Sequence, residues 1–137
     1  MGVKILIVDD ELDMLALLAM IIAEKTEHKV DTTNNPLEVP GLIKTGDYNL
    51  LISDLKMPSM DGVELITEIR KIDKHIPILI ITAYGSVESA EEVIRKGAYD
   101  CITKPFRKEQ ILIAIDRALE WHQMKKELSE LKKTKND

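Results

Sequence analysis

The sequence contains a single cysteine and few aromatic residues, and both shortages narrow the class of protein. Only 4% of its 137 residues are aromatic, so aliphatic side chains and methionine must build the core. One cysteine, Cys101, excludes an intrachain disulfide and favours a reducing compartment. Acidic residues outnumber basic ones by 24 to 19, and the resulting net charge of −5 argues against a nucleic-acid-binding surface on this domain.

The sequence also lacks a hydrophobic run long enough to cross a bilayer. Its longest apolar runs, 14–23 and 76–83, are shorter than the roughly 20 residues that a membrane-spanning helix needs. A strand-like segment begins directly after Met1 and Gly2, which argues against a signal peptide. We therefore expect a cytoplasmic protein without membrane contacts, and its length fits one compact domain.

Short aliphatic segments alternate with amphipathic ones along the whole chain. Five segments are expected to be strands: Val3–Val8, Lys29–Thr33, Asn49–Ser53, Pro77–Thr82 and Asp100–Thr103. Five are expected to be helices: Glu11–Lys25, Pro36–Lys44, Val63–Ile72, Val87–Lys96 and a long last one from Lys108. The first, third and fourth strands are apolar nearly throughout, as strands buried on both faces are. This alternation predicts an α/β fold, a parallel sheet with helices on both faces.

The second of these predicted helices has the weakest helical pattern, because proline and glycine interrupt it. Pro36, Pro40 and Gly41 all fall within it, and a proline in a helix interior costs about 3 kcal/mol or more. We therefore expect this helix to begin late or to be broken. The fourth helix has regular boundaries, with Ser86 as a candidate N-cap and Gly97 where the helix should end.

Polar residues stand at the carboxyl ends of the predicted strands. There are five of them: Asp9, Asp10, Asp54, Thr82 and Lys104. The carboxyl ends of parallel strands meet at one edge of the sheet, where open α/β sheets bind their ligands. Crowded carboxylates need a cation, and oxygen ligands beside a phosphate-type substrate favour Mg²⁺. A carboxylate next to Mg²⁺ can attack a phosphoryl group, whose oxygens a lysine ammonium and a threonine hydroxyl can hold.

Four blocks of this sequence resemble the receiver domains of two-component response regulators. They are residues 5–11, 54–62, 82–85 and 97–106, and the match covers roughly Val3 to Glu120. The last two blocks are most similar to receivers of nitrogen-regulation-class activators, or of some hybrid kinases. Together with the alternation, the resemblance implies a flavodoxin-like, doubly wound sheet of five parallel strands in the order 2-1-3-4-5.

The resemblance also implies a phosphorelay function with Mg²⁺ as the cofactor. Asp54 would accept phosphate from a phosphohistidine on a sensor histidine kinase, and the domain would then switch conformation to control an output. Asp10 and Asp54 would bind Mg²⁺ directly, with Asp9 acting mainly through water. The backbone carbonyl of Lys56 would be a further metal ligand.

Three other positions take their roles from the same resemblance. Lys104 would pair with the phosphoryl group and precede a cis peptide bond to Pro105, while Thr82 would move toward the phosphate as the switch residue. The family usually has tyrosine or phenylalanine three residues before the lysine, where this sequence has Cys101. The threonine half of the switch is thus present, and the aromatic half is replaced.

Taken singly, each of these residues also fits an ordinary structural role. The acidic pair could cap the first helix, Thr82 could be a plain strand end, and Cys101 a small buried side chain. A second possible function is an aspartyl-phosphate phosphohydrolase, although such enzymes commonly carry an acid where this chain has Lys56. A third is a receiver-like interaction module that is never phosphorylated. The first helix also has a second apolar stripe, including Leu12 and Leu15, which helix packing or kinase docking would explain.

After about Glu120 the sequence becomes charged and lacks turn residues. This change predicts a receiver domain at 1–120 and a helical extension at 121–137 that leads toward an output domain. Four residues recur at the three-four-three spacing of a coiled-coil seam: Trp121, Met124, Leu128 and Leu131. We expect a homodimer through this helix. In the alternative, Trp121 folds back on the domain and the remainder frays.

Overall fold

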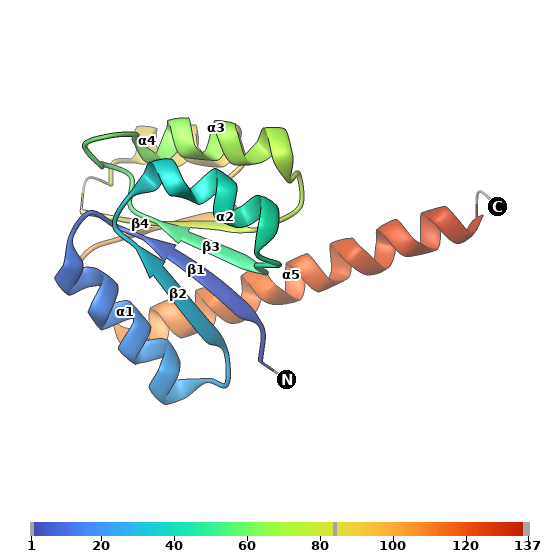
Figure 1. Cartoon of the computed structure of the whole chain (residues 1–137), viewed down its shortest axis with the longest axis horizontal. Coiled ribbons are helices and arrows are strands. Elements are labelled where there is room, and N and C mark those ends of the chain that lie inside the picture. Colours follow the sequence, from blue (N-terminus) through green and yellow to red (C-terminus); the bar gives the residue numbers. More distant parts are fainter. Residues whose placement is uncertain (1, 84, 136–137) are drawn as a thin grey trace.

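Five parallel strands form one sheet in the order β2-β1-β3-β4-β5 in the computed structural model, which describes residues 2–83 and 85–135 (Figure 1). The strands are β1 (Lys4–Val8), β2 (Lys29–Thr33), β3 (Leu50–Ser53), β4 (Ile78–Thr82) and β5 (Asp100–Thr103). Every neighbouring pair is parallel. The predicted flavodoxin-like order is confirmed, and each strand lies within one residue of its predicted bounds.

Helices cover both faces of this sheet (Figure 1). They are α1 (Leu12–Lys25), α2 (Val39–Thr45), α3 (Gly62–Ile72), α4 (Val87–Lys96) and α5 (Lys108–Lys135). The α1 and α5 helices lie on one face, and α2, α3 and α4 lie on the other. This arrangement is the doubly wound one that strict strand-helix alternation predicts.

The segment with two prolines is broken, as expected. Its first part, Pro36–Glu38, is a single 3₁₀ turn, and α2 begins only at Val39. Pro40 therefore lies in the first turn of α2, where a backbone N–H would have no partner within the helix. The chain thus avoids the energetic penalty of a proline in a helix interior.

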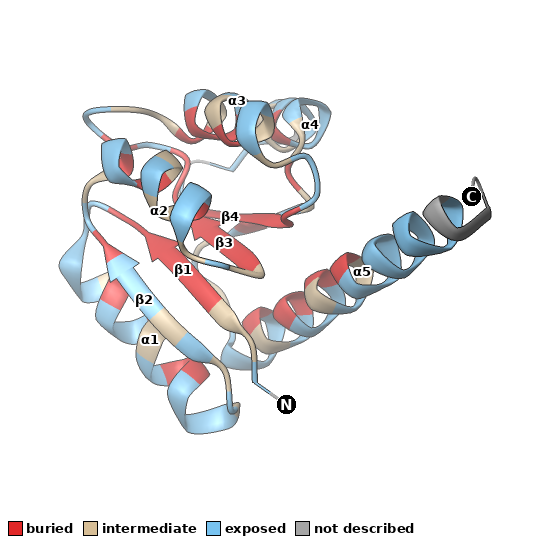
Figure 2. Cartoon of the chain, turned by 45° about the vertical axis from the view of Figure 1, so that its right-hand side comes forward, coloured by how far each residue is buried: buried red, intermediate tan, exposed pale blue. Residues whose placement is uncertain are grey.

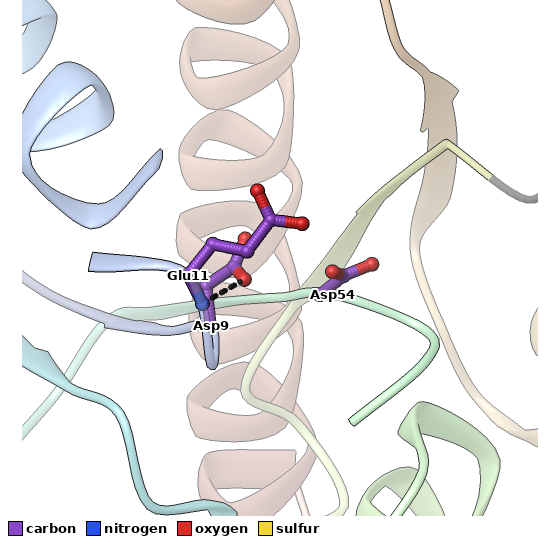
Figure 3. Close-up of side chains that lie close together, drawn as sticks. All are labelled: Asp9, Glu11 and Asp54. Carbon is purple, nitrogen blue, oxygen red and sulfur yellow. Dashed lines mark hydrogen bonds between the residues drawn. The ribbon is translucent and has the colours of Figure 1, made fainter. Parts of the chain in front are cut away.

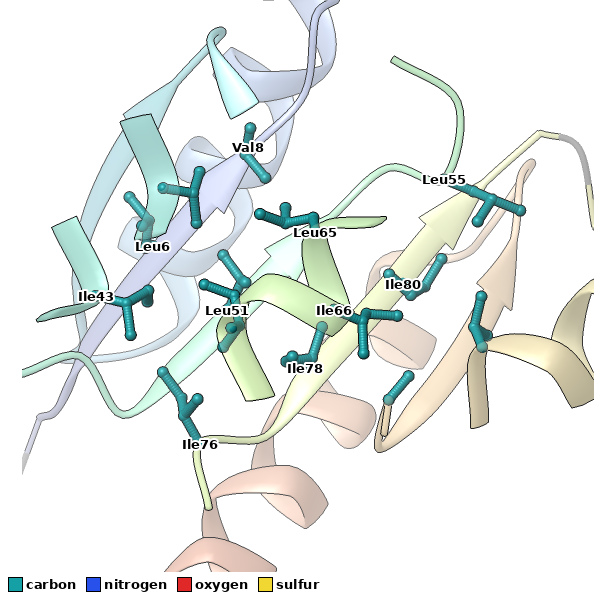
Figure 4. Close-up of a cluster of buried hydrophobic side chains, with 14 of the residues drawn as sticks. Leu6, Val8, Ile43, Leu51, Leu55, Leu65, Ile66, Ile76, Ile78 and Ile80 are labelled. Atoms are coloured by element: carbon teal, nitrogen blue, oxygen red, sulfur yellow. The ribbon is translucent and has the colours of Figure 1, made fainter. Parts of the chain in front are cut away.

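The three central strands send alternate side chains into two separate cores. On β1, Ile5 and Ile7 pack on the side of α1 and α5, whereas Leu6 and Val8 pack on the side of α2, α3 and α4 (Figure 4). All four side chains are fully buried, and β1 after Lys4, β3 and β4 are buried throughout (Figure 2). Polar residues can therefore stand only where these strands end.

The last helix is the longest element and projects beyond the sheet (Figure 1). Its first half buries Ile111, Ala114, Ile115 and Ala118 against the core, and residues 123–132 are exposed. Among the helices of the described residues, none combines the length and the apolar character needed to cross a membrane.

Candidate functional site

Four of the predicted site residues meet at the carboxyl edge of the sheet. Asp9 follows β1, Asp54 follows β3, Thr82 ends β4 and Lys104 follows β5. The sheet hydrogen bonds continue one step past the strands, because Asp54 N–H donates to the Val8 carbonyl at 3.2 Å and Lys104 N–H donates to the Thr82 carbonyl at 2.8 Å. The strands themselves therefore hold these residues side by side.

Two buried carboxylates share one ammonium at this edge. Lys104 Nζ lies 3.6 Å from Asp9 Oδ2 and 3.6 Å from Asp54 Oδ2. The aspartates are only 2% and 5% exposed, and the lysine side chain is 12% exposed, so solvent screens these charges weakly. One positive charge thus faces two negative ones in a largely dry site.

A third carboxylate joins this pair (Figure 3). Carboxylate oxygens of Asp9, Glu11 and Asp54 all lie within 4.8 Å of one another, and Asp9 Oδ1 also accepts the Glu11 backbone N–H at 2.9 Å. Three carboxylates opposed by one lysine leave an excess of negative charge. Clustered carboxylate oxygens with excess negative charge fit a hard divalent cation such as Mg²⁺.

The Asp9 carboxyl shows the electrostatic cost of this arrangement. Burial raises its pKa above the ordinary value of 3.8, because an ionised carboxylate loses its hydration. The backbone N–H of Glu11 opposes this rise in pKa, the negative charge of Asp54 adds to it, and Lys104 opposes it. The fold therefore holds Asp9 where burial disfavours its charged form.

Other predicted ligands are placed less centrally. Asp10 is exposed and does not belong to the group formed by Asp9, Glu11 and Asp54. The sequence does not single out Glu11 as a ligand, although its position directly after the acidic pair is a usable signal. Glu11 also occupies the N-cap position of α1 without a side-chain capping bond, so helix capping does not account for the acidic pair.

The predicted switch positions lie on β4 and β5, the two strands at this part of the edge. Thr82 is fully buried at the end of β4, and the Lys104–Pro105 peptide bond is cis, as the resemblance implied. Cys101 is half-buried on β5, and burial raises the pKa of its thiol, so it stays protonated as a small hydrophobic side chain would. Tyr84, the second residue after Thr82, lies outside the described residues.

A comparison with protein families settles which family has this arrangement. The family model of the response regulator receiver domain matches residues 5–116. This chain belongs to the receiver family. It is similar to the regulatory protein AtoC of Escherichia coli (strain K12), with 34% identity over 128 residues that cover 93% of this chain and 28% of AtoC. The receiver thus spans less than a third of that longer relative.

Solved structures show the same relationship. NtrX from Brucella abortus, in complex with ADP, has a TM-score of 0.89 and 34% identity, covering 96% of this chain and 30% of that one. The beryllofluoride-activated NtrC4 receiver domain dimer has a TM-score of 0.82 and 34% identity, covering 87% of this chain and 98% of that one. The resemblance to nitrogen-regulation-class receivers is therefore confirmed.

Proposed function

We propose that Asp54 accepts a phosphoryl group in a Mg²⁺-dependent reaction and that the domain then switches conformation to control an output. The observation that carries this proposal is the buried Asp54 carboxylate, 3.6 Å from Lys104, among further carboxylates that fit a divalent cation. The resemblance assigns the ion to Asp9, Asp10 and Asp54 with the Lys56 carbonyl, and the Glu11 carboxylate, which lies beside Asp9 and Asp54, would join them. A bound Mg²⁺ would neutralise the phosphoryl oxygens during transfer.

The remaining steps belong to the protein's own side chains. An Asp54 carboxylate oxygen attacks phosphorus, the phosphorus–nitrogen bond of a phosphohistidine breaks, and the imidazole leaves. Lys104, which the structure pairs with two carboxylates, then binds a phosphoryl oxygen, and the Thr82 hydroxyl binds another. This new contact of Thr82 would start the conformational switch. The product is an aspartyl phosphate.

A receiver of this kind catalyses only its own phosphorylation and dephosphorylation. The alternative of a phosphohydrolase has little support, because the residue two positions after Asp54 is the exposed Lys56 rather than a second acid. Mixing the protein with an excess of a phosphomonoester distinguishes the two, since only a phosphohydrolase releases many phosphates per chain.

A cytoplasmic location is also proposed, because a lone thiol favours a reducing environment.

The central test is labelling with acetyl phosphate and Mg²⁺, followed by intact-mass spectrometry. The wild-type chain should gain one phosphoryl group, and Asp54→Asn should gain none. Asp116→Asn is a matched control, because it removes an exposed aspartate from α5 and should label as the wild type does. Stoichiometric labelling of Asp54→Asn would contradict the assignment, and an unlabelled wild type would favour the interaction module.

The phosphodonor is proposed to be a sensor histidine kinase that docks beside the site. An apolar groove opens next to Lys104, lined by Met14, Leu17, Ala83, Lys104, Pro105 and Phe106. The second apolar stripe of α1 divides between two roles. Leu15 is buried and serves helix packing, whereas Leu12 is 66% exposed and is available for kinase docking. Leu17→Glu should slow phosphotransfer from a kinase but leave labelling by acetyl phosphate unchanged. Equal slowing with both donors would contradict docking here.

The helical extension at 121–137 is proposed to lead from the receiver at 1–120 toward an output domain and to form a homodimer. Trp121 packs on Tyr99 with ring centroids 5.5 Å apart, so this residue folds back on the domain as the alternative to a coiled coil expected. The remainder does not fray, however, because the helix continues to Lys135. The remaining seam residues are 61%, 54% and 60% exposed: Met124, Leu128 and Leu131. Their outward stripe fits a second copy, and the related NtrC4 receiver was solved as a dimer.

Sedimentation of the full chain tests the homodimer. A double variant, Leu128→Glu with Leu131→Glu, should be monomeric at concentrations where the wild type is dimeric, because charge on the stripe opposes its burial. Ser129→Glu places a charge on a different face of the same helix and should leave the dimer intact. A wild-type chain that stays monomeric, with or without phosphate on Asp54, rules the dimer out.

A further inference from the structure

We propose that Ser53 is a positioning residue that fixes the orientation of the Asp54 carboxylate for phosphoryl transfer. The proposal rests on the proposed function of Asp54 and adds a residue that holds it. Ser53 is the last residue of β3, and it is the one polar residue of an otherwise aliphatic strand, Leu-Leu-Ile-Ser.

The Ser53 hydroxyl lies in the core and has a specific partner. Ser53 is 1% exposed, and its neighbours in register on β1 and β4 are the apolar residues Val8 and Ile80. A buried hydroxyl without a hydrogen bond is unfavourable, so its partner decides what the residue does. Ser53 Oγ donates to the backbone carbonyl of Asp54 at 2.8 Å.

That carbonyl belongs to the peptide unit that also holds the Asp54 side chain. The Asp54 carbonyl and the Leu55 N–H are the two ends of one planar peptide group, so fixing one end fixes the direction of the other. The Leu55 N–H donates to Asp54 Oδ1 at 2.7 Å. Ser53 therefore holds the oxygen end of a peptide whose N–H end holds the reacting carboxylate.

The start of α3 closes the other side of this peptide. A side chain at Gly62 would place its Cβ 2.9 Å from the Asp54 carbonyl oxygen, so the backbone of α3 lies directly against that group. Gly62 N–H also donates to the Leu55 carbonyl at 2.7 Å. The Leu55 N–H binds Oδ1 of the Asp54 carboxylate, and Lys104 lies 3.6 Å from Oδ2. Contacts at both oxygens therefore define one orientation of this carboxylate.

A purely structural serine would satisfy its own hydroxyl and support the strand without acting on the carboxylate. Three variants of the full chain separate these roles. Ser53→Ala removes the donor, Ser53→Thr keeps a hydroxyl at the same position, and Ile80→Val removes a buried methyl group from the residue paired with Ser53 on β4. The last variant controls for a general loss of core packing.

The first readout is the Leu55 amide proton in a ¹H–¹⁵N NMR spectrum, which needs no phosphorylation. An N–H bonded to a carboxylate resonates downfield, so Ser53→Ala should shift this proton upfield, and Ser53→Thr should restore most of the shift. Ile80→Val should leave it near the wild-type position. An unchanged Leu55 proton in Ser53→Ala overturns the proposal.

The second readout is the initial rate of labelling by acetyl phosphate at saturating Mg²⁺. Ser53→Ala should be slower by about fivefold, the rate change that corresponds to one neutral hydrogen bond. Ser53→Thr should recover the rate, and Ile80→Val should keep it. A rate in Ser53→Ala equal to that of Ile80→Val also overturns the proposal. If the wild type itself is not labelled, the proposed function fails, while the Leu55 signal still decides whether Ser53 orients the carboxylate.

Discussion

The two edges of the central sheet hold charged groups in opposite ways. At the carboxyl edge, Asp9 and Asp54 are buried together and share a single lysine. At the amino edge, Arg70 lies half-buried at the end of α3, and its Nε and Nη2 donate to the Gly97 carbonyl at 3.2 and 2.6 Å. Its Nη1 donates to the Asp73 carbonyl at 3.1 Å. The first arrangement is short of positive charge, whereas the second is satisfied by neutral acceptors.

The helix dipole explains the charges at the helix ends on both edges but not the two buried aspartates. All helices of this fold begin near the carboxyl edge, where partial positive charge favours acids, and end near the amino edge, where bases are favoured. Acids stand in first turns at Asp13, Glu64, Glu88 and Glu109. Bases stand in last turns at Lys25, Lys44, Arg70, Lys71, Arg95 and Lys96. Asp9 and Asp54 precede no helix directly, and their burial points to function rather than stability.

The largest effect on stability is expected at the amino edge. Arg70→Met removes three hydrogen bonds from a charged donor to two carbonyls and should lower the free energy of unfolding by about 2–3 kcal/mol. Urea denaturation measures it, and the affinity for Mg²⁺ should stay at the wild-type value. A large change in Mg²⁺ affinity would mean that the two edges are coupled rather than independent.

The opposite sign is expected at the carboxyl edge. Burial raises the pKa of Asp9, so its ionised form destabilises the folded state at neutral pH. Asp9→Asn should therefore raise the free energy of unfolding when no metal is present, by less than Arg70→Met lowers it. Adding Mg²⁺ should stabilise the wild type by mass action and the variant much less. Urea denaturation with and without Mg²⁺ checks both, and a destabilised Asp9→Asn would refute the contrast between the edges.

A smaller, pH-dependent effect is expected where α5 leaves the sheet. His122 is buried, its Nδ1 lies 3.2 Å from the His75 carbonyl oxygen, and burial lowers its pKa below 6.5. The hydrogen bond to His75 and the charge of Asp73 oppose this lowering, while Lys126 adds to it. The unfolded chain then binds a proton more readily than the folded one, so stability is full above pH 6.5 and falls as the pH drops below it.

His122→Asn removes this titration and should flatten the dependence. Thermal melting between pH 8 and pH 5.5 should show a smaller loss of stability below pH 6.5 in the variant than in the wild type. His28→Asn is the matched control. The His28 ring belongs to another part of the chain, where its Nδ1 accepts a hydrogen bond from the Val3 N–H. If the melting temperatures of wild type and His122→Asn fall equally between pH 8 and pH 5.5, protonation of His122 does not contribute to the pH dependence of stability.

The smallest effect on stability is expected from Tyr84, which stands two residues after Thr82 in the sequence and lies outside the described residues. We predict that it hinders the attacking water, so Tyr84→Ala should lose phosphate faster than the wild type while its stability is nearly unchanged. Intact-mass spectrometry over time after removal of acetyl phosphate measures the loss. Equal lifetimes of the phosphoryl group in both proteins would show that Tyr84 does not hinder the attacking water.

The same contrast shows which parts of the molecule are predictable. Ile5, Leu6, Ile7 and Val8 form an uninterrupted apolar run, as strands covered on both faces do. The position of Asp54 at the site follows from the same reasoning, because parallel strands end at one edge. Pro40 predicts a break, and the structure places Pro40 in the first turn of α2, the helix that follows the break.

The amino edge is far less predictable. In the sequence His122 is one of three scattered histidines, yet it is buried against the chain that enters β4. Trp121 fits a coiled-coil spacing, yet its ring packs on Tyr99. Both contacts join segments more than twenty residues apart, and no local pattern records such a pairing. Their partners depend on where α5 crosses the sheet.

By itself, then, the sequence determined the strands, the parallel sheet and the edge at which Asp9, Asp54, Thr82 and Lys104 meet. These features follow from local periodicity and from the few topologies that alternating elements allow, and the strand order came from the resemblance to receiver domains. Tertiary structure alone decided that the Glu11 carboxylate joins those of Asp9 and Asp54 within 4.8 Å, while Asp10 is exposed, because the turn between β1 and α1 sets the direction of three consecutive acidic side chains. It also decided that the peptide after Asp54 is held between β3 and α3, since that contact exists only once the helix has packed on the sheet.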